Sequence, residues 1–297
     1  MSAPGGSDGG WATIIYEVHG HVARIVMNRP EKHNAENFQL ADERDAAFRK
    51  ADADPEIRVV VLAANGKSFS AGHDVTQVYG DEHMKAIRAN INSRVEFERR
   101  FYFESALRIQ NLSKPTIAAV QGNCIAGGLM TAAMCDLIVA ADDAKFSDPL
   151  LGFVAMRGLD ELADAKRSGG DVSLEVFYQP WQLGVRRAKE LLFTGEPMTA
   201  EEAKQIGFVN RVVPKAHLEE ASMAMANRIA MANPGALALV KRSFQHTLEA
   251  QGQREAYEYH FLLHQLRHDG LAEPWLRPPA TEPGESWRTF APLPDEG

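Results

Sequence analysis

The pattern of apolar and polar positions predicts alternating strands and helices along most of the chain. Short, mostly apolar and β-branched runs predict strands at residues 14–17, 22–27, 58–63, 116–120 and 137–141. Apolar positions at helical spacing predict helices at residues 36–51 and 83–112. Such alternation favours parallel strands with right-handed crossovers, so we expect an α/β fold.

From residue 184 onward the pattern is mainly helical. Thr199 and Glu202 have capping-box spacing, and Gly195 is suited to end the helix before them. Asn233-Pro234 separates two further predicted helices, at residues 216–231 and 235–267. We therefore expect a flexible lead-in at residues 1–10 and a core at residues 11–195. A C-terminal helical region at residues 196–270 and a Pro-rich tail at residues 271–297 follow.

Composition narrows the class of protein. The 297 residues are 45% hydrophobic and 24% charged, which is typical of a globular protein, and the formal net charge of −8 argues against binding to nucleic acid or to an anionic membrane. Two cysteines without metal-ligand spacing, Cys124 and Cys135, indicate a reducing compartment and no disulfide. No apolar run reaches about 18 residues and the N-terminus lacks the pattern of a targeting peptide, so we expect a cytoplasmic protein.

Candidate chemistry lies in two loops that each follow an apolar strand. In the first, Gly127-Gly128 stands between the strand at 116–120 and a short segment of small and apolar residues that we expect to be a buried helix. In the second, Ser68-Phe-Ser-Ala-Gly72 follows the strand at 58–63. Glycine lets a backbone approach a ligand closely, so each loop can supply one N–H group to the same oxygen. A Gly-Gly pair alone is more often a tight turn.

Together these loops resemble those of the crotonase family, the enoyl-CoA hydratases and isomerases. The resemblance runs from about Ile14 to about Asp269 and includes the segments 27–35 (MNRPEKHNA), 191–195 (LLFTG), 200–203 (AEEA) and 207–214 (GFVNRVVP). It implies a spiral of repeated β-β-α turns and a C-terminal helical region that packs in trimers or dimers of trimers. It also implies an acyl-CoA thioester as substrate, with coenzyme A entering as part of it and no separate cofactor or metal.

The resemblance assigns the thioester oxygen to the backbone amides of His73 and Gly127. The residues around those donors, which are Ala71, Gly72, Asp74 and Gly128, are then expected to contact the substrate. Because the donors are backbone groups, the side chain at position 73 is free to vary. We therefore interpret the imidazole of His73 as tolerated rather than catalytic.

The sequence departs from the family at both hydratase glutamates. Met130 and Leu150 occupy these two positions and would only line the substrate, since neither side chain can move a proton. Ordinary two-glutamate hydration is therefore doubtful, whereas thioester binding is not affected.

Two other carboxylates are candidates for the missing acid or base. Glu175 and Asp148 lie near the acyl end implied by the resemblance, and a carboxylate in an apolar pocket has a raised pKa suited to proton transfer. The structural alternative is that Glu175 caps or pairs with a helix and Asp148 bonds amides at a turn. His264 and His268 have a spacing that can bind metal, but no third ligand is evident.

Four basic residues are candidates for the phosphates of coenzyme A: Arg29, Lys32, Lys67 and Lys241. Exposed lysines are commonly only solvated. Residues 157–173 look like an insertion near the acyl end, either a solvated loop or a lid.

The leading hypothesis is an acyl-CoA enzyme that stabilises an enolate or related oxyanion and catalyses hydration or dehydration, double-bond isomerisation, or C–C or thioester cleavage. The alternatives are a CoA-thioester hydrolase or decarboxylase of the same family, and a non-catalytic acyl-CoA-binding oligomer.

Overall fold

The computed structural model describes residues 10–80, 82–149 and 175–268. Its larger sheet has the order β1-β2-β3-β4-β6-β9. The strands are β1 (Ile14–His19), β2 (Val22–Met27), β3 (Val59–Ala64), β4 (Thr116–Val120), β6 (Leu137–Ala141) and β9 (Arg211–Val213). β1 and β2 form an antiparallel hairpin that turns at Gly20, and every later pairing in this sheet is parallel. The predicted strands are therefore confirmed.

Three short strands form a second sheet, and they alternate along the chain with strands of the larger sheet. It consists of β5 (Asn123–Ile125), β7 (Lys145–Ser147) and β8 (Met198–Thr199), in the order β5-β7-β8. β4 leads into β5, and β6 leads into β7, so each turn of the chain adds one strand to each sheet. Since β8 and β9 belong to these sheets, the core extends to Val213 and past the boundary predicted at residue 195.

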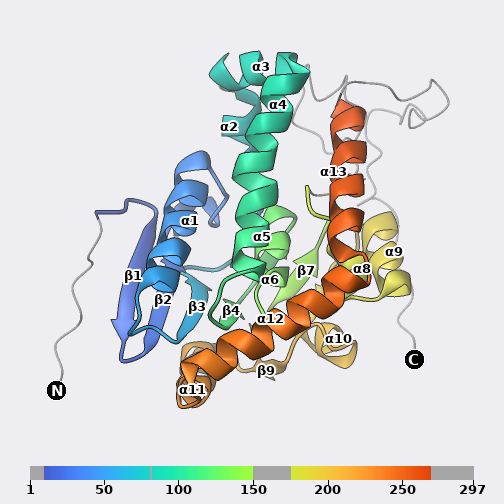
Figure 1. Ribbon diagram of the computed structural model, residues 1–297. Coiled ribbons are helices and arrows are strands. Elements are labelled where there is room, and N and C mark those ends of the chain that lie inside the picture. Colours follow the sequence, from blue (N-terminus) through green and yellow to red (C-terminus); the bar gives the residue numbers. More distant parts are fainter. Residues whose placement is uncertain (1–9, 81, 150–174, 269–297) are drawn as a thin grey trace.

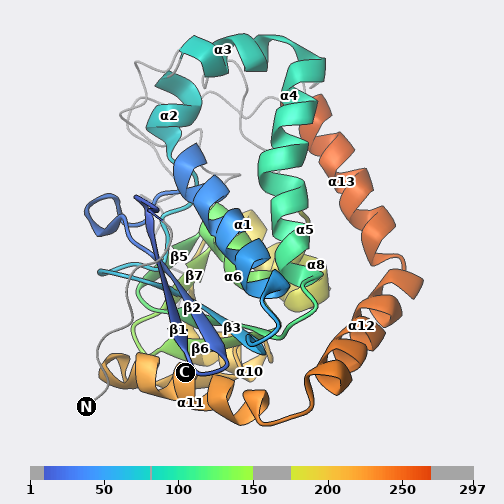
Figure 2. The same cartoon turned by 60° about the vertical axis from the view of Figure 1, so that its left-hand side comes forward.

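Helices cover both faces of the larger sheet (Figures 1 and 2). One face packs against α1 (Phe38–Ala53) and a long helical stretch, made of α4 (Ile91–Glu98), the π-helical turn η2 (Arg99–Phe103) and α5 (Glu104–Gln110). The opposite face packs against α11 (Leu218–Ala230). The shorter helices are η1 (Pro30–Lys32), α2 (Val75–Gly80), α3 (Glu82–Ala89), α8 (Gln179–Gln182), α9 (Val185–Thr194), α10 (Ala200–Gln205) and η4 (Lys215–His217).

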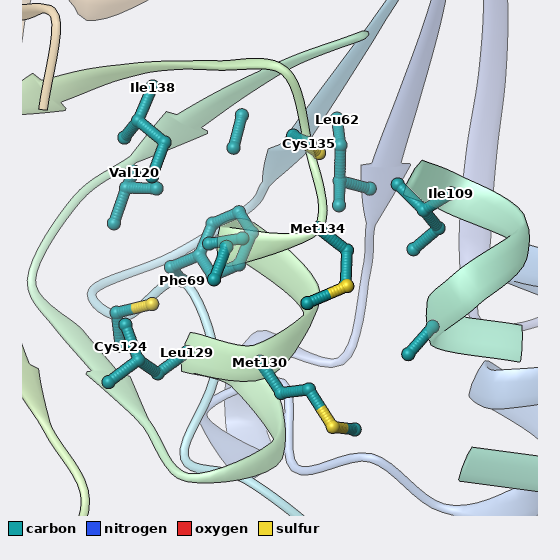
Figure 3. Packing of buried hydrophobic residues seen from close by; sticks show 14 of the residues in the cluster. Leu62, Phe69, Ile109, Val120, Cys124, Leu129, Met130, Met134, Cys135 and Ile138 are labelled. Atoms are coloured by element: carbon teal, nitrogen blue, oxygen red, sulfur yellow. The ribbon is translucent and has the colours of Figure 1, made fainter. Parts of the chain in front are cut away.

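The short helix α6 (Gly127–Ala133) lies in the centre of the core, and all seven of its residues are buried. Figure 3 shows its side chains Leu129 and Met130 in the same cluster as Leu62 and Phe69. The expected buried helix is therefore confirmed. Its burial fixes the position of Gly127, the first residue of the helix.

Local capping signals also agree with the sequence. Thr199 and Glu202 form the predicted capping box at the start of α10, and Gly195 ends α9 in the left-handed conformation. The predicted helix at 235–267 is wrong in one respect. It divides into α12 (Pro234–Ala250) and α13 (Gln253–His268), because Gly252 adopts φ +90° and bends the chain between them.

After this break, α13 runs alongside α4 and η2, as both cartoon views show. Arg99 of η2 is paired with Glu258 of α13 at 2.9 Å, and Arg94 of α4 donates to Gln265 at 3.2 Å. These contacts bring α13 to helices that precede β4. Among the helices within the described ranges, none is long and apolar enough to cross a membrane.

Candidate active site

The two glycine-containing loops lie against each other through backbone pairing. The amide of Ser70 donates to the carbonyl of Asn123 at 3.1 Å, and the amide of Ile125 donates to the carbonyl of Ser70 at 3.0 Å. The glycines allow this approach. A Cβ atom at Gly128 would lie 2.5 Å from Cβ of Ser70, and Gly72 adopts φ +86° with its Cβ position 3.5 Å from the amide nitrogen of Gly127.

This packing brings the amides of His73 and Gly127 into neighbouring stretches of backbone. Glu36 donates to the carbonyl of Gly72 at 2.8 Å and accepts from the amide of Asp74 at 3.0 Å, so the peptide groups on both sides of His73 are held. Within the residues that the structure describes, the amides of His73 and Gly127 themselves donate no hydrogen bond. Two fixed and unsatisfied N–H groups are suited to bind one oxygen atom.

The imidazole of His73 lies directly over Gly127. A Cβ atom at Gly127 would lie 2.6 Å from Cδ2 and 2.7 Å from Nε2 of His73, so only glycine leaves room for this ring. The ring of Tyr102, from η2, stacks on the imidazole with 4.1 Å between ring centroids. The other ring nitrogen of His73, Nδ1, lies 3.8 Å from Oε1 of Glu175.

A buried ion pair also lies close to Gly127. Oε1 of Glu36 is 2.5 Å from Nη1 of Arg44 and accepts a hydrogen bond from the hydroxyl of Thr131 at 3.2 Å. Burial by itself raises the pKa of Glu36, but the charges of Arg44 and His73 outweigh it and hold the pKa below its ordinary value. Glu36 is therefore a fixed negative charge beneath the site.

Glu175 has the opposite electrostatic character. Burial raises the pKa of Glu175, the charges of His73 and His264 reduce that increase, and the charge of Glu98 adds to it. Its second oxygen, Oε2, is buried and accepts no hydrogen bond from the described parts of the chain. A buried carboxylate with a raised pKa is suited to take up and release a proton near neutral pH.

The surroundings of Glu175 come from α4 and α13. Nε2 of His264 is 3.2 Å from Oε2 of Glu98, which also accepts from Gln265 at 2.5 Å. One turn earlier on α13, His260 stacks on Phe177 at 4.5 Å between ring centroids and so fixes the segment that carries Glu175. His264 thus pairs with a carboxylate, the side chain of His268 is outside the described part, and no cluster of three potential metal ligands exists among the described residues.

Asp148 lies at the end of β7, directly after Ser147, whose carbonyl accepts from the amide of Ala126 at 3.0 Å. Its carboxylate is fully buried, and Oδ2 accepts a hydrogen bond from Gln179 of α8 at 2.8 Å. The neighbouring Tyr178 has a raised pKa, first because it is buried and second because of the charge of Asp148. This hydrogen bond joins two segments of the core through a side-chain amide, and not through the backbone amides of a turn that the structural alternative expects.

The basic candidates fall into two groups. Lys32 and Lys67 are exposed on adjoining loops, which the hydrogen bond from the amide of Ala71 to the carbonyl of His33 holds together at 3.0 Å. Arg29, in contrast, pairs with Asp74 at 3.2 Å and braces the loop that carries His73. The ammonium of Lys241 is buried 2.7 Å from Asp136, so this charge is already matched inside the protein.

A model of the enoyl-CoA hydratase/isomerase family matches residues 17–270 of the chain. The protein belongs to this family. EchA13 of Mycobacterium tuberculosis, whose name places it among the enoyl-CoA hydratases, is 37% identical over 270 residues, which cover 86% of this chain and 80% of EchA13. The chain is also 30% identical to a short-chain-enoyl-CoA hydratase of Clostridium acetobutylicum, over 80% of this chain and 82% of the relative.

Solved structures of this family share the fold. A probable enoyl-CoA hydratase from Mycobacterium thermoresistibile has a TM-score of 0.75 at 43% identity and covers 86% of this chain and 97% of its own. An enoyl-CoA hydratase/isomerase from Xanthobacter autotrophicus Py2 has a TM-score of 0.77 at 32% identity and covers 90% of each chain. The predicted crotonase fold is therefore confirmed.

Within this crotonase fold, the structure places one of the two substituted glutamate positions. Met130 is buried in α6, one turn after Gly127, and carries only a thioether into the core. Leu150 and the segment 157–173 lie outside the described residues. The imidazole of His73, with Glu175 3.8 Å from it, lies beside Gly127, whereas the thioether of Met130 cannot move a proton.

Sequence reasoning missed three side chains near His73 and Glu175, which are Glu36, Glu98 and Tyr102. It named His264 only as a possible metal ligand. Glu36 comes directly after the segment 27–35, which resembles the family, so its place in the sequence could have identified it as a candidate. Glu98 and Tyr102 are four residues apart on one helical stretch, but nothing in the sequence indicates that this face meets His73 and His264.

Proposed function

We propose that the protein is an acyl-CoA enzyme that stabilises a thioester enolate with the backbone amides of His73 and Gly127. The observation that carries this proposal is the pair of unsatisfied amides, which the glycines at 72, 127 and 128 bring into neighbouring backbone. Negative charge gathers on the thioester oxygen in the transition state, and one fixed donor to such an oxygen is worth roughly 2.7–4 kcal/mol. Side chains at the two positions do not affect this contribution.

Glu175 is the carboxylate that we assign to proton transfer in place of the two lost glutamates. Its burial, its raised pKa and its position 3.8 Å from the imidazole of His73 support this role. Asp148 is the second choice, because its carboxylate is occupied by Gln179. The reaction that we propose first is the addition of water to a 2-enoyl-CoA, in keeping with the names of the relatives.

Coenzyme A would enter as part of the substrate, and we propose no further cofactor and no metal. Lys32 and Lys67 are our candidates for its phosphates because both are exposed on adjoining loops near Ala71. Ala71, Gly72, Asp74, Gly128 and Met130 are proposed to surround the thioester and acyl group.

We also propose that the chain forms a homotrimer or a dimer of trimers through α12 and α13. Large apolar side chains on these helices are exposed, and such a surface indicates a protein contact: Leu239, Val240, Phe244, Tyr259, Leu262 and Leu266. Sedimentation analysis of the natural chain and of Phe244→Glu tests this assignment. A monomer for both chains would remove it. A cytoplasmic location stays a prediction.

Mass spectrometry of 2-butenoyl-CoA after incubation with the full chain in D₂O tests the proposed function. We expect product heavier by the elements of D₂O, formed about 10²–10⁴-fold more slowly by Glu175→Gln. The matched control is Glu96→Gln, which changes an exposed carboxylate of α4 and leaves the site intact.

Other outcomes of the same experiment identify the alternatives. Free coenzyme A would indicate a thioester hydrolase, and release of carbon dioxide from a malonyl-type thioester would indicate a decarboxylase. Deuterium gained without added oxygen would indicate an isomerase. Tight binding with every one of these thioesters unchanged would contradict the enzyme assignment and leave an acyl-CoA-binding oligomer.

A further inference from the structure

The orientation of His73 goes beyond what backbone amides require. A donor amide at position 73 needs no imidazole, yet this ring is directed onto Gly127, with Nε2 only 2.7 Å from where a Cβ atom of Gly127 would lie. Nε2 is shielded from solvent and, in the described part of the chain, has no hydrogen-bond partner. A reactive nitrogen therefore lies next to the amide that is proposed to hold the thioester oxygen.

Two side chains approach the ring directly, and the carboxylate of Glu36 lies close by. Tyr102 stacks on one face, with an interplanar angle of 21°. Glu175 lies 3.8 Å from Nδ1, and the carboxylate of Glu36 lies on the side of Gly127, where Oε2 is 3.5 Å from the same Cβ position. Glu175 and Glu36 thus place two carboxylates near the ring.

We propose that the side chain of His73 is a catalytic acid and base that works as a dyad with Glu175. The proposal rests on the proposed function and assigns to this pair the proton transfer that Met130 and Leu150 cannot perform. It reverses the expectation that the imidazole is merely tolerated. Glu36 and Tyr102 are then positioning residues, because they hold the ring without reaching the substrate.

The proton balance of hydration is complete with these groups alone. Nε2 of neutral His73 accepts a proton from water while the water oxygen bonds to C3 and the π electrons of the C2–C3 double bond move toward the thioester oxygen. The carboxylate of Glu175 stabilises the imidazolium through Nδ1–H. As the enolate returns to a thioester, C2 takes a proton from Nε2, and the dyad regains its starting state.

The test compares His73→Gln with His246→Gln, which changes an exposed histidine of α12. Both variants keep the backbone amide at the mutated position. For turnover of 2-butenoyl-CoA we expect kcat of His73→Gln to fall about 10²–10⁴-fold with KM within about threefold, while His246→Gln is unchanged. The double variant His73→Gln/Glu175→Gln is expected to be no slower than the slower single variant, since two members of one unit are not additive.

The pH profile separates catalysis from packing. The groups that face the pair are Glu36 with Arg44 behind it, Tyr102 from η2, Glu98 from α4 and His264 from α13. All of them remain in His73→Gln, so the loss of one limb of the kcat profile in this variant belongs to His73. Equal rates for His73→Gln and His246→Gln, with Glu175→Gln inactive, would overturn the dyad and leave Glu175 acting alone.

A different readout applies if the natural chain turns over no thioester, which is the failure of the proposed function itself. The ¹⁵N shifts of the His73 ring in the full chain then report the pair directly. We expect Glu175→Gln to change the tautomer or protonation of His73 and Glu96→Gln to leave both unchanged. Identical ring shifts in all three proteins would overturn the dyad.

Discussion

Nδ1 of His73 lies 3.8 Å from Oε1 of Glu175, at the point where the loop after β3 meets the segment before α8. Neither residue stands at a position of the two usual hydratase glutamates. Their approach depends on Gly127, which leaves room for the ring, and on α13, which fixes the Glu175 segment through the stack of His260 on Phe177. The site is therefore built from segments that are far apart in the sequence.

The buried pair of Glu36 and Arg44 should be essential for stability. Arg44→Met leaves a buried carboxylate without its partner, and breaking such a pair costs about 3–5 kcal/mol. Arg49→Met, on the same helix, removes an exposed ion pair with Asp45 and should cost less than about 1 kcal/mol. Urea unfolding of both variants measures this difference. Equal losses in the free energy of unfolding would show that the buried pair stabilises the fold no more than the Arg49–Asp45 pair does.

Ionisation of the buried Glu175 carboxyl should lower the free energy of unfolding at neutral pH. Its pKa in the folded protein is raised above 4.5, so the stabilising protonated form is fully present below pH 4.5 and is lost as pH rises through the folded pKa. Glu175→Gln cannot ionise and should gain stability relative to the natural chain as pH rises from 4.5 to 7.5. Thermal unfolding across this range, with Glu96→Gln as control, measures it. A difference that does not depend on pH would contradict the raised pKa.

Gly127→Ala should disturb the site through the ring of His73. The new Cβ atom would lie 2.6 Å from Cδ2 of His73, and overpacking of this kind costs about 1–3 kcal/mol. In a His73→Ala background the space is open, so the same change should cost much less. A double-mutant cycle read by urea unfolding gives the coupling between the two positions, and strictly additive losses would mean that the ring does not lie over Gly127.

Gly252 should be required for the bend between α12 and α13. Its φ of +90° is unfavourable for any residue with a Cβ atom, although the surrounding space is open, so Gly252→Ala should lose about 1–2 kcal/mol through strain alone. Gln251→Ala, at an adjacent position with negative φ, should change stability by no more than about 0.5 kcal/mol. Thermal unfolding compares the two, and a neutral Gly252→Ala would imply that the helices join differently.

Features that depend on neighbouring residues were predictable from the sequence. The β1–β2 hairpin, the buried strands, the capping box at Thr199 and the buried helix after Gly127 all follow from local patterns of apolar residues, glycine and capping side chains. The break at Gly252 was missed because a single glycine inside a helical pattern is commonly tolerated. The π-helical turn η2 was missed because its apolar residues also fit a regular helix.

Features that depend on tertiary contact were predictable only in part. The resemblance to the crotonase family gave the fold, and it suggested the two amides. It gave no reason to pair His73 with Glu175, because residues distant in sequence form that contact. The burial of Lys241 against Asp136 could also not be predicted. The sequence places this lysine in a helix but does not show which face of the helix packs against the core.

Enolate formation is the central claim, and exchange at C2 of butanoyl-CoA in D₂O tests it most directly. This saturated thioester cannot be hydrated, so deuterium at C2 reports only proton removal next to a stabilised thioester oxygen. Proton NMR should show exchange by the natural chain and by His246→Gln, and at least about 100-fold slower exchange by His73→Gln and Glu175→Gln. Exchange no faster than in protein-free buffer, with butanoyl-CoA bound, would contradict the account.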